Sequence, residues 1–449
     1  MIIIRKIPSF NRPRHSEMKS IFVVVGLLII FFSPFNIYRI PLSSIVTLSF
    51  TKILFFLALF LLLSLFATSR HSFNRFVRVL YFFWPTIFAY LILILSFGMM
   101  LLRSNSIAYS IKIIVLSVVV VSMSFLIAYL GRRPGRLILM LKALLVGSLV
   151  VSGFGLFQIV HFYLFGDIPP APFLDYFLLP HEDSKLHREF MWYIPGFVPR
   201  IISVLSEPNA LGLYLALVLF INAWVIKYRS YLNLGSGLFR LSILSSIFTI
   251  IPFIMTFSRS GWLTLIVGLG VLALGFSAKA RVKSFFLVLA FLVVSLVLIT
   301  YFMPNIGEAL LERFSIDETY GHIDIRLHAL SFFVDMPLLG VGFGNYGLLA
   351  GNSFGVSSTH SFYVTYLVEG GLIGGLAFLF FIFSLAFIFI LKNGGKLSRD
   401  PYWLLGFGIA IMIIINNIFY HTFWLEITWV ALGIAFAALY IFSSQRNQI

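Results

Sequence analysis

Several arginines stand beside breaks in long apolar stretches of this sequence. Arg200 opens one such stretch and is followed by a Glu-Pro-Asn break at 207–209. Arg326 lies in Asp-Ile-Arg-Leu-His (324–328), a pattern that predicts the start of a short amphipathic helix. Ionisable side chains at the edge of an apolar stretch are costly to keep there, so they are candidates for function. For Arg200 the alternative is a proline kink with an arginine that extends to the interface.

Arg259 is the only charged residue of residues 241–278 and lies in the short turn Thr-Phe-Ser-Arg-Ser-Gly-Trp (256–262). The hydroxyl groups of Ser258 and Ser260 can hold its guanidinium or share an anionic ligand with it. The alternative is that Arg259 only anchors the turn at a membrane surface.

His360 stands between Thr359 and Ser361 at the beginning of another long apolar stretch. Thr359 is a plausible N-cap for a helix that begins here. The positive end of the helix dipole disfavours imidazolium and keeps the imidazole neutral, which is the form that a general base requires. The alternative is a histidine with a structural role at the interface. The preceding glycines at 340, 342 and 344 allow close backbone approach, but no strand precedes them, so they predict no nucleotide fold.

The amino-acid composition of the chain indicates whether water or lipid surrounds these residues. Of its 449 residues 60% are hydrophobic and 11% are charged, and the mean hydropathy is +1.02. This is more apolar surface than a soluble domain can bury, so the expected fold class is an all-α polytopic membrane protein. The net charge of +16 comes from short clusters between apolar stretches, which indicates membrane topology and no nucleic-acid partner. Cysteine is absent, which excludes disulfides and thiolate metal sites.

The apolar stretches predict about twelve transmembrane helices. The second is long and contains Lys52, so a short re-entrant piece followed by a helix is the alternative. Residues 1–19 are basic and lack a cleavage site, so they are interpreted as a retained cytoplasmic tail. The predicted spans lie near 20–36, 41–68, 80–102, 107–130, 137–165, 201–226, 241–257, 262–276, 285–303, 360–391, 402–421 and 425–443.

Charge distribution predicts the orientation. When alternate connections are assigned to opposite sides, most Lys and Arg fall on the side of the N-terminus, and nearly all acidic residues fall on the other. Since cytoplasmic connections are enriched in Lys and Arg, both termini are expected in the cytoplasm. Two long connections, 166–199 and 304–359, then face the outside, and the second separates the ninth and tenth spans.

These features divide the chain into six predicted parts. The parts are a tail (1–19), N-terminal transmembrane helices (20–165), an outer loop (166–199), transmembrane helices with the Ser-Arg-Ser turn (200–303), a large periplasmic loop (304–359) and C-terminal transmembrane helices (360–449).

Over about residues 195–440 the chain resembles the bacterial O-antigen ligase and polysaccharide polymerase superfamily. The family pattern His-[Asn/Ser/Gln]-x9-Gly-x-x-[Gly/Thr/Tyr] is met by His360, Ser361, Gly371 and Gly374. The Arg-x-x-x-Leu pattern of its large outer loop is met by Arg326 and Leu330. The Pro-Leu-Leu-Gly-x-Gly stretch and the Ser-Arg-Ser turn are also similar. The N-terminal third is similar in topology only.

The resemblance implies a metal-independent inverting glycosyltransferase of the C type, in the cell inner membrane and without a cofactor. Such an enzyme transfers a glycan from undecaprenyl diphosphate to an acceptor, either another glycan or lipid A-core, and works beside a flippase and a chain-length regulator. Arg200, Arg259 and Arg326 are then expected to bind the diphosphate, because guanidinium pairs bidentately with phosphate. Arg326 is also expected to act in catalysis, and His360 as the base.

Several alternatives stay open at this stage. Glu207 and Glu369 are the two acidic residues that can orient His360 or an arginine, and Ser258 and Ser260 are expected to support Arg259. Ligase and polymerase share these motifs and differ mainly in the acceptor. The alternative from another class is a transporter or flippase of lipid-linked glycans, which would bind the same donor without reaction. Histidines and aspartates at 181–187 and 322–324 match no standard metal-site spacing, so no metal is expected.

Overall fold

A computed structural model describes most of the chain, and every structural statement below concerns the residues that it describes. These are residues 15–35, 39–41, 47–104, 107–166, 193–194, 198–205, 207–276, 316–342, 344–347, 349, 359, 361–420, 422–423 and 425–446.

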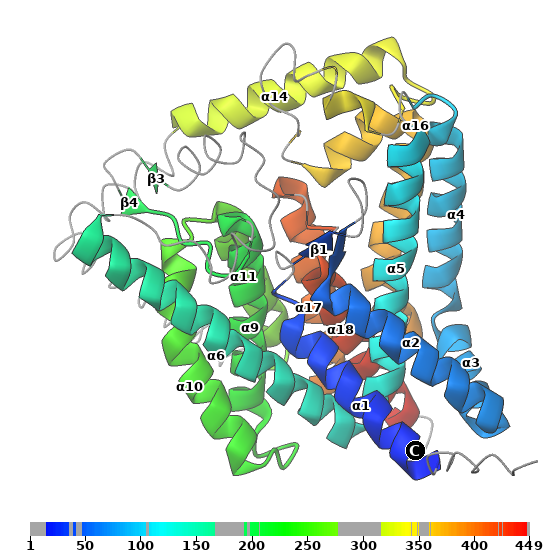
Figure 1. Ribbon diagram of the computed structural model, residues 1–449, viewed down its shortest axis with the longest axis vertical. Coiled ribbons are helices and arrows are strands. Elements are labelled where there is room, and N and C mark those ends of the chain that lie inside the picture. The colour runs from blue at the N-terminus through cyan, green and yellow to red at the C-terminus, as the bar shows by residue number, and fades with distance from the viewer. Residues whose placement is uncertain are drawn as a thin grey trace, which may run out of the picture.

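The described part of the chain is almost entirely helical (Figure 1). Its first half contains α1 (His15–Phe32), α2 (Phe50–Thr68), α3 (Arg70–Phe82), α4 (Trp84–Leu101), α5 (Ile107–Gly131) and α6 (Pro134–Phe165). Its second half contains α9 (Pro208–Tyr228), α10 (Ser236–Met255), α11 (Arg259–Ala273), α14 (Ile316–Asp335), α16 (Phe362–Lys392), α17 (Pro401–Phe419) and α18 (Glu426–Arg446). Two short antiparallel pairs join β1 (Arg39–Pro41) to β2 (Thr47–Ser49) and β3 (Tyr193–Ile194) to β4 (Val198–Pro199).

Nine of the described helices are long and apolar enough to cross a membrane, so the chain is a multi-pass membrane protein. They are α2, α4, α5, α6, α9, α10, α16, α17 and α18, and each corresponds to one of the twelve predicted spans. The first and eighth predicted spans correspond to α1 and to the shorter apolar helix α11. The ninth, 285–303, lies outside the described residues.

The second predicted span begins too early. The helix starts at Phe50 and not at 41, and the residues before it pair as β1 and β2, with Arg39 opposite Ser49. The Oγ atom of Ser49 caps the helix by accepting a hydrogen bond from the backbone N–H of Lys52 at 3.4 Å. Lys52 therefore lies in the first turn of α2 and does not interrupt a longer helix.

The sixth predicted span also begins too early, because its helix starts at Pro208 and not at 201. Proline is favoured in the first turn of a helix, where its missing N–H has no partner to lose, and it disfavours helical geometry in the residue before it. Residues 200–205 are non-helical as well, and they are nevertheless buried. The Glu-Pro-Asn motif therefore begins the helix instead of breaking it.

The helices pack around a central pair, α17 and α18, which contact α5, α9, α11 and α16 (Figure 1). Trp403 of α17 and Trp429 of α18 are almost completely buried there. Between α6 and α10, hydroxyl pairs hold the helices together, with 2.8 Å from Ser148 to Ser245 and 3.0 Å from Ser152 to Thr249. These bonds satisfy polar groups that lipid cannot.

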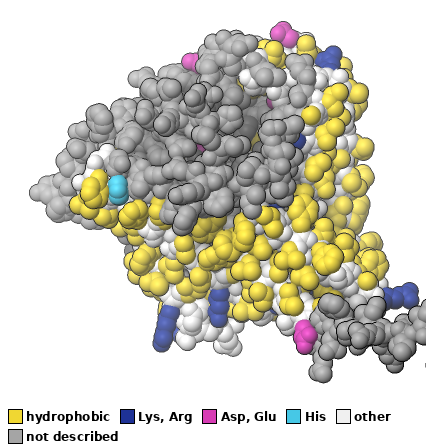
Figure 2. Space-filling model, in the orientation of Figure 1, with side chains coloured by type: hydrophobic (Ala, Val, Ile, Leu, Met, Phe, Trp, Pro, Cys, Tyr) yellow, Lys and Arg dark blue, Asp and Glu magenta, His cyan; other side chains and the backbone are white. Residues whose placement is uncertain are grey.

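The two ends of the bundle differ. The C-terminus and the first residues of α1 lie at one end, and α14 lies across the other (Figure 1). Figure 2 shows hydrophobic side chains over much of the described visible surface, and Lys or Arg side chains at both ends of the bundle. The predicted sidedness, with both termini in the cytoplasm, would place α14 outside. We call the end that carries α14 the outer end.

Candidate functional site

The non-helical segment before α9 is wedged between α6 and α10. The N–H of Ile201 donates to the carbonyl oxygen of Met255 at 3.0 Å, and the N–H of Ser203 donates to Oε1 of Gln158 at 2.8 Å. Ser203 has a positive φ of 53°, a conformation that residues other than glycine rarely adopt. Phe257, in the turn after α10, also has a positive φ, of 48°. Such backbone conformations occur where surrounding contacts enforce them, often at functional sites.

These contacts place Arg200 in a buried corner, with 9% of its surface exposed. Its Nε atom donates to the carbonyl oxygen of Thr256 at 3.2 Å, and its Nη2 atom donates to Oδ1 of Asn209 at 3.3 Å. Thr256 follows the last turn of α10, whereas Asn209 is in the first turn of α9. Arg200 is therefore held where the end of α10 meets the start of α9, beside the N-cap residue Glu207.

Arg259 is the first residue of α11, and the start of α11 lies against the start of α9. A side chain on Gly261 would lie 2.9 Å from the carbonyl carbon of Gly212, so the two backbones approach each other closely. The N–H groups at both helix starts create positive potential, which favours anions. The structure thus brings Arg200 and Arg259 to the same corner of the bundle.

The two serines of the turn hold its backbone. Ser258 is the N-cap of α11, and its Oγ atom accepts a hydrogen bond from the N–H of Gly261 at 3.2 Å. The hydroxyl groups of Ser258 and Ser260 are 3.1 Å apart. Both serines are buried, so they fix the position of Arg259 through the helix start.

Arg326 contacts the helix bundle at its outer end. It lies in the middle of α14, so a helix is present as predicted, but it begins at Ile316 and not near residue 324. Its Nη2 atom donates to the carbonyl oxygen of Ile418, in the last turn of α17, at 3.5 Å. Partial burial lowers the pKa of the Arg326 guanidinium from its ordinary value, because burial disfavours the charged form.

The last turns of α17 also hold two other helices of the site. The hydroxyl group of Tyr363, near the start of α16, donates to the carbonyl oxygen of Ile414 at 3.1 Å. Nδ2 of Asn416 donates to Oγ1 of Thr264, in α11, at 3.2 Å. With a rise of about 1.5 Å per residue, Ile414 and Ile418 are about 6 Å apart along the helix. The outer turns of α17 therefore join α11, α14 and α16.

His360 lies outside the described residues, whereas its two neighbours are buried. The hydroxyl oxygen of Thr359 accepts a hydrogen bond from the N–H of Ser361 at 3.2 Å and lies 2.7 Å from Oγ1 of Thr365. The N-cap of α16 is Ser361, so the prediction that Thr359 caps this helix is wrong by two residues. Phe362 stacks on Phe423 with ring centroids 4.9 Å apart, which fixes the helix start beside the connection between α17 and α18.

The glycine-rich segment after α14, which contains Gly340 and Gly342, packs against a kink in α16. At Gly371 the backbone leaves helical geometry, with a φ of 59° and a ψ of −158°. The carbonyl oxygens of Val368 and Glu369 accept hydrogen bonds from the N–H groups of Val341 and Gly342, both at 3.0 Å. Beyond the kink, the N–H of Leu372 donates to the carbonyl oxygen of Pro337 at 2.7 Å. The segment after α14 thus replaces hydrogen bonds that the kink removes.

Glu369 belongs to this junction. Its side chain is 7% exposed, and the backbone N–H groups of Gly344 and Tyr346 donate to its carboxylate. The carboxylate therefore holds the glycine-rich segment against α16. The sequence suggested His360 or an arginine as its partner, and His360 lies outside the described residues.

Sequence reasoning missed a buried ion pair at the outer end. The Nζ atom of Lys52 lies 3.0 Å from Oε1 of Glu426, and Ser49 donates a hydrogen bond to the same oxygen at 2.7 Å. The pair joins the start of α2 to the start of α18. Its signal in the sequence is one lysine and one glutamate in or beside long apolar stretches. Asn209, Asn416 and Tyr363 were missed as well, since neutral polar residues are common in such helices.

A comparison with known protein families matches residues 243–379 to the family model described as O-antigen ligase. The matched region runs from α10 to the middle of α16 and includes Arg259, Arg326, His360 and Glu369, while Arg200 precedes it. No curated protein matches the chain. The match lies within residues 195–440 and confirms the resemblance inferred from the motifs.

Proposed function

We propose that this membrane protein, whose residues 243–379 match the family model described as O-antigen ligase, is a C-type glycosyltransferase of cell-surface polysaccharide synthesis. It transfers a glycan from undecaprenyl diphosphate to an acceptor hydroxyl group on the outer face of the cell inner membrane. The observation that carries this proposal is the convergence at the outer turns of α17. Arg326 donates to Ile418 there, and Tyr363, three residues after His360, donates to Ile414.

Arg200 and Arg259 hold the diphosphate of the donor in this proposal. Arg259 begins α11, and Arg200 donates a hydrogen bond to Asn209 in the first turn of α9, so guanidinium groups and helix N–H groups favour the same anion. Arg326 approaches from α14 and stabilises the negative charge that develops on the leaving diphosphate. Ser258, Ser260 and Glu207 support the two helix starts.

His360 acts as the general base. It takes the proton of the acceptor hydroxyl group while the acceptor oxygen forms a bond to the anomeric carbon of the donor sugar. The bond from that carbon to the phosphate oxygen breaks, and undecaprenyl diphosphate leaves with the electron pair. One displacement of this kind inverts the anomeric configuration. No metal or nucleotide takes part in the proposed step.

The acceptor decides between the two activities of the superfamily. Lipid A-core as acceptor makes the protein a ligase, and a second lipid-linked repeat unit makes it a polymerase. In either case the donor arrives through a flippase, and a chain-length regulator is an expected partner. The large outer loop, 304–359, and the Ser-Arg-Ser turn are the parts of the predicted domain division that we assign to the site.

Analysis of surface glycans in a deletion strain tests the proposal. We expect either loss of surface glycan with long chains accumulating on undecaprenyl diphosphate, which indicates a ligase, or a surface with single repeat units, which indicates a polymerase. A normal glycan profile with a normal carrier pool contradicts both. Lipid-linked glycan that accumulates on the cytoplasmic leaflet would instead support a transporter.

A further inference from the structure

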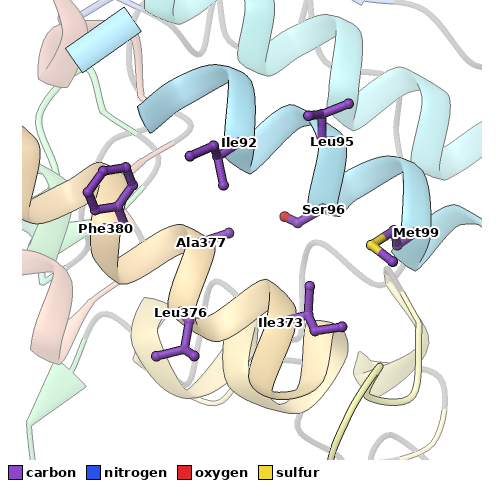
Figure 3. Close-up of a pocket in the computed structure, with 8 residues that line it drawn as sticks. All are labelled: Ile92, Leu95, Ser96, Met99, Ile373, Leu376, Ala377 and Phe380. Atoms are coloured by element: carbon purple, nitrogen blue, oxygen red, sulfur yellow. The ribbon is translucent and has the colours of Figure 1, made fainter. Parts of the chain in front are cut away.

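An apolar groove runs between α4 and α16 on the side of the bundle away from α9 and α11 (Figures 1 and 3). It has a volume of about 430 Å³, which is within the range of about 300–1,000 Å³ typical of small-molecule sites. Its floor includes the small residues Ser96 and Ala377, and larger side chains form its walls (Figure 3). The hydroxyl group of Ser96 donates to the carbonyl oxygen of Leu93 at 2.7 Å, so the floor is apolar in effect.

The groove is open along its length. Leu95 of α4 is 71% exposed, and Leu376 and Phe380 of α16 are 55% and 50% exposed. Both helices are candidate membrane spans, so these side chains face hydrocarbon and not water. A hydrocarbon chain is therefore the ligand that the lining favours.

Arg103 stands at the outer end of this groove. It follows the end of α4, Leu101, by two residues and the groove residue Met99 by four, and its side chain is exposed. Its Nη1 atom donates to the carbonyl oxygen of Gly340 at 3.2 Å and contacts Sδ of Met336 at 3.4 Å. The turn that follows α14 and contacts Arg103 also contacts α16, the other wall of the groove. There the N–H of the groove residue Ile373 donates to the carbonyl oxygen of Leu338 at 3.3 Å. The guanidinium of Arg103, held by these contacts, thus lies at the outer end of the apolar groove.

We propose that the α4–α16 groove binds an anionic glycerophospholipid, with one acyl chain along the groove and the phosphate at Arg103. The exposed guanidinium has five N–H donors, and its two protein contacts use Nη1, so other donors can reach a phosphate. Arg326 is nine residues before the end of α14, about 14 Å along the helix, whereas Arg103 contacts the residue that follows that end. The lipid site is therefore separate from the proposed donor site, and it does not depend on glycan transfer.

Photo-crosslinking with the full-length protein in lipid nanodiscs tests this site. The probes are phosphatidylglycerol and phosphatidylcholine that carry the same photoreactive acyl chain, and peptides are mapped by mass spectrometry. We expect phosphatidylglycerol to label residues 92–99 and 373–380 about fivefold more than phosphatidylcholine does, which is the ratio for about 1 kcal/mol per cation at a membrane surface. Arg103→Gln should remove this preference, and Arg103→Lys should keep most of it.

Matched variants test the groove itself. Leu376→Trp fills the groove and should lower labelling by both lipids, whereas Ile247→Trp, at a position 62% exposed on α10, should leave labelling unchanged. Equal labelling of the groove and of α10, or an unchanged preference in Arg103→Gln, would overturn the proposal. Displacement of the probe by unlabelled undecaprenyl diphosphate would assign the groove to the donor and would also overturn it.

Discussion

At the scale of single residues, the proposed chemistry divides between His360 as the base and three arginines that bind phosphate. The two roles predict different defects in variants, since proton transfer affects the reaction, whereas a phosphate contact affects both binding and reaction. Glu369 and the two serines of the turn belong to a third group, because their hydrogen bonds hold backbone.

We predict that His360→Ala lowers the rate of glycan transfer about 100- to 10,000-fold, the usual contribution of a general base. Donor affinity should stay close to that of the wild type. The measurement is transfer by the purified protein together with equilibrium binding of the lipid-linked donor. His161→Ala is the matched control, because His161 lies on α6 beside Phe157 and Phe165. Full transfer by the His360→Ala protein would remove the histidine from the mechanism.

We predict that Arg259→Ala and Arg326→Ala weaken donor binding about 10- to 100-fold, because each removes a charge-assisted hydrogen bond worth about 1.5–3 kcal/mol. Arg259→Lys should recover only part of the affinity, since lysine lacks the bidentate geometry. Titration of the protein with undecaprenyl-diphosphate-linked glycan measures this effect. Arg240→Ala, near the other end of α10, should bind the donor normally. Unchanged donor affinity in both Arg259→Ala and Arg326→Ala would show that these arginines do not bind the diphosphate.

At the scale of helices and their connections, the kink of α16 and the glycine-rich segment form one junction. A side chain on Gly340 would lie 2.4 Å from the carbonyl oxygen of Val368, and Gly340 has a φ of 65°. Since α14 carries Arg326, this junction determines how the arginine is presented to α17.

We predict that Gly340→Ala destabilises the protein by about 1–3 kcal/mol through backbone strain, with the collision adding to it. The variant should unfold at a lower temperature in detergent and should transfer glycan more slowly. Gly237→Ala is the control, because a side chain at that position of α10 meets open space. Equal unfolding temperatures for the two variants would show that the junction does not constrain the fold.

The buried pair of Lys52 and Glu426 makes a second prediction at this scale. Removal of one partner leaves the other charge buried, which costs about 3–5 kcal/mol. Lys52→Met and Glu426→Leu should each lower the unfolding temperature in detergent, and the double variant should be less affected than either single variant. Ser49→Ala, which removes one neutral donor, should have a smaller effect. A double variant as unstable as the sum of the two singles would mean that the charges do not interact.

Hydropathy predicted the helices well and their first residues poorly. Hydropathy depends on composition and not on backbone conformation. The predicted spans therefore included the strands β1 and β2 together with α2, and the buried segment 200–205 together with α9. The arginines of the site were recognisable, because a charge beside an apolar stretch is conspicuous. Their arrangement around α17 was not, since Arg326 and Ile418 are separated by 92 residues and meet only through packing.

At the scale of the whole molecule, sidedness decides whether the site faces the lipid-linked donor. The first residues of α1 and the end of α18 lie at one end of the bundle, and α14 lies at the other (Figure 1). The basic residues of the connections predict that the termini are cytoplasmic. The arginines of the site would then lie at the outer surface.

We predict that a cysteine at position 336 reacts with a membrane-impermeant thiol reagent in intact cells, whereas a cysteine at position 444 reacts only after permeabilisation. Met336 and Ser444 are both exposed, and the natural chain has no cysteine, so each variant carries a single thiol. Mass tagging in cells or spheroplasts measures the reaction. The opposite labelling pattern would show that the orientation in the membrane is reversed and that the site faces the cytoplasm, where the proposed reaction does not take place.

The proposed activity is the transfer of a lipid-linked glycan and not its transport alone. The most direct measurement follows purified protein in proteoliposomes with a lipid-linked glycan donor and an acceptor, and detects free undecaprenyl diphosphate together with the new glycosidic bond. We expect both products in equal amounts, with inverted configuration at the anomeric carbon, from the wild type and not from His360→Ala. Movement of intact donor between leaflets with no free undecaprenyl diphosphate would contradict the account and identify a transporter.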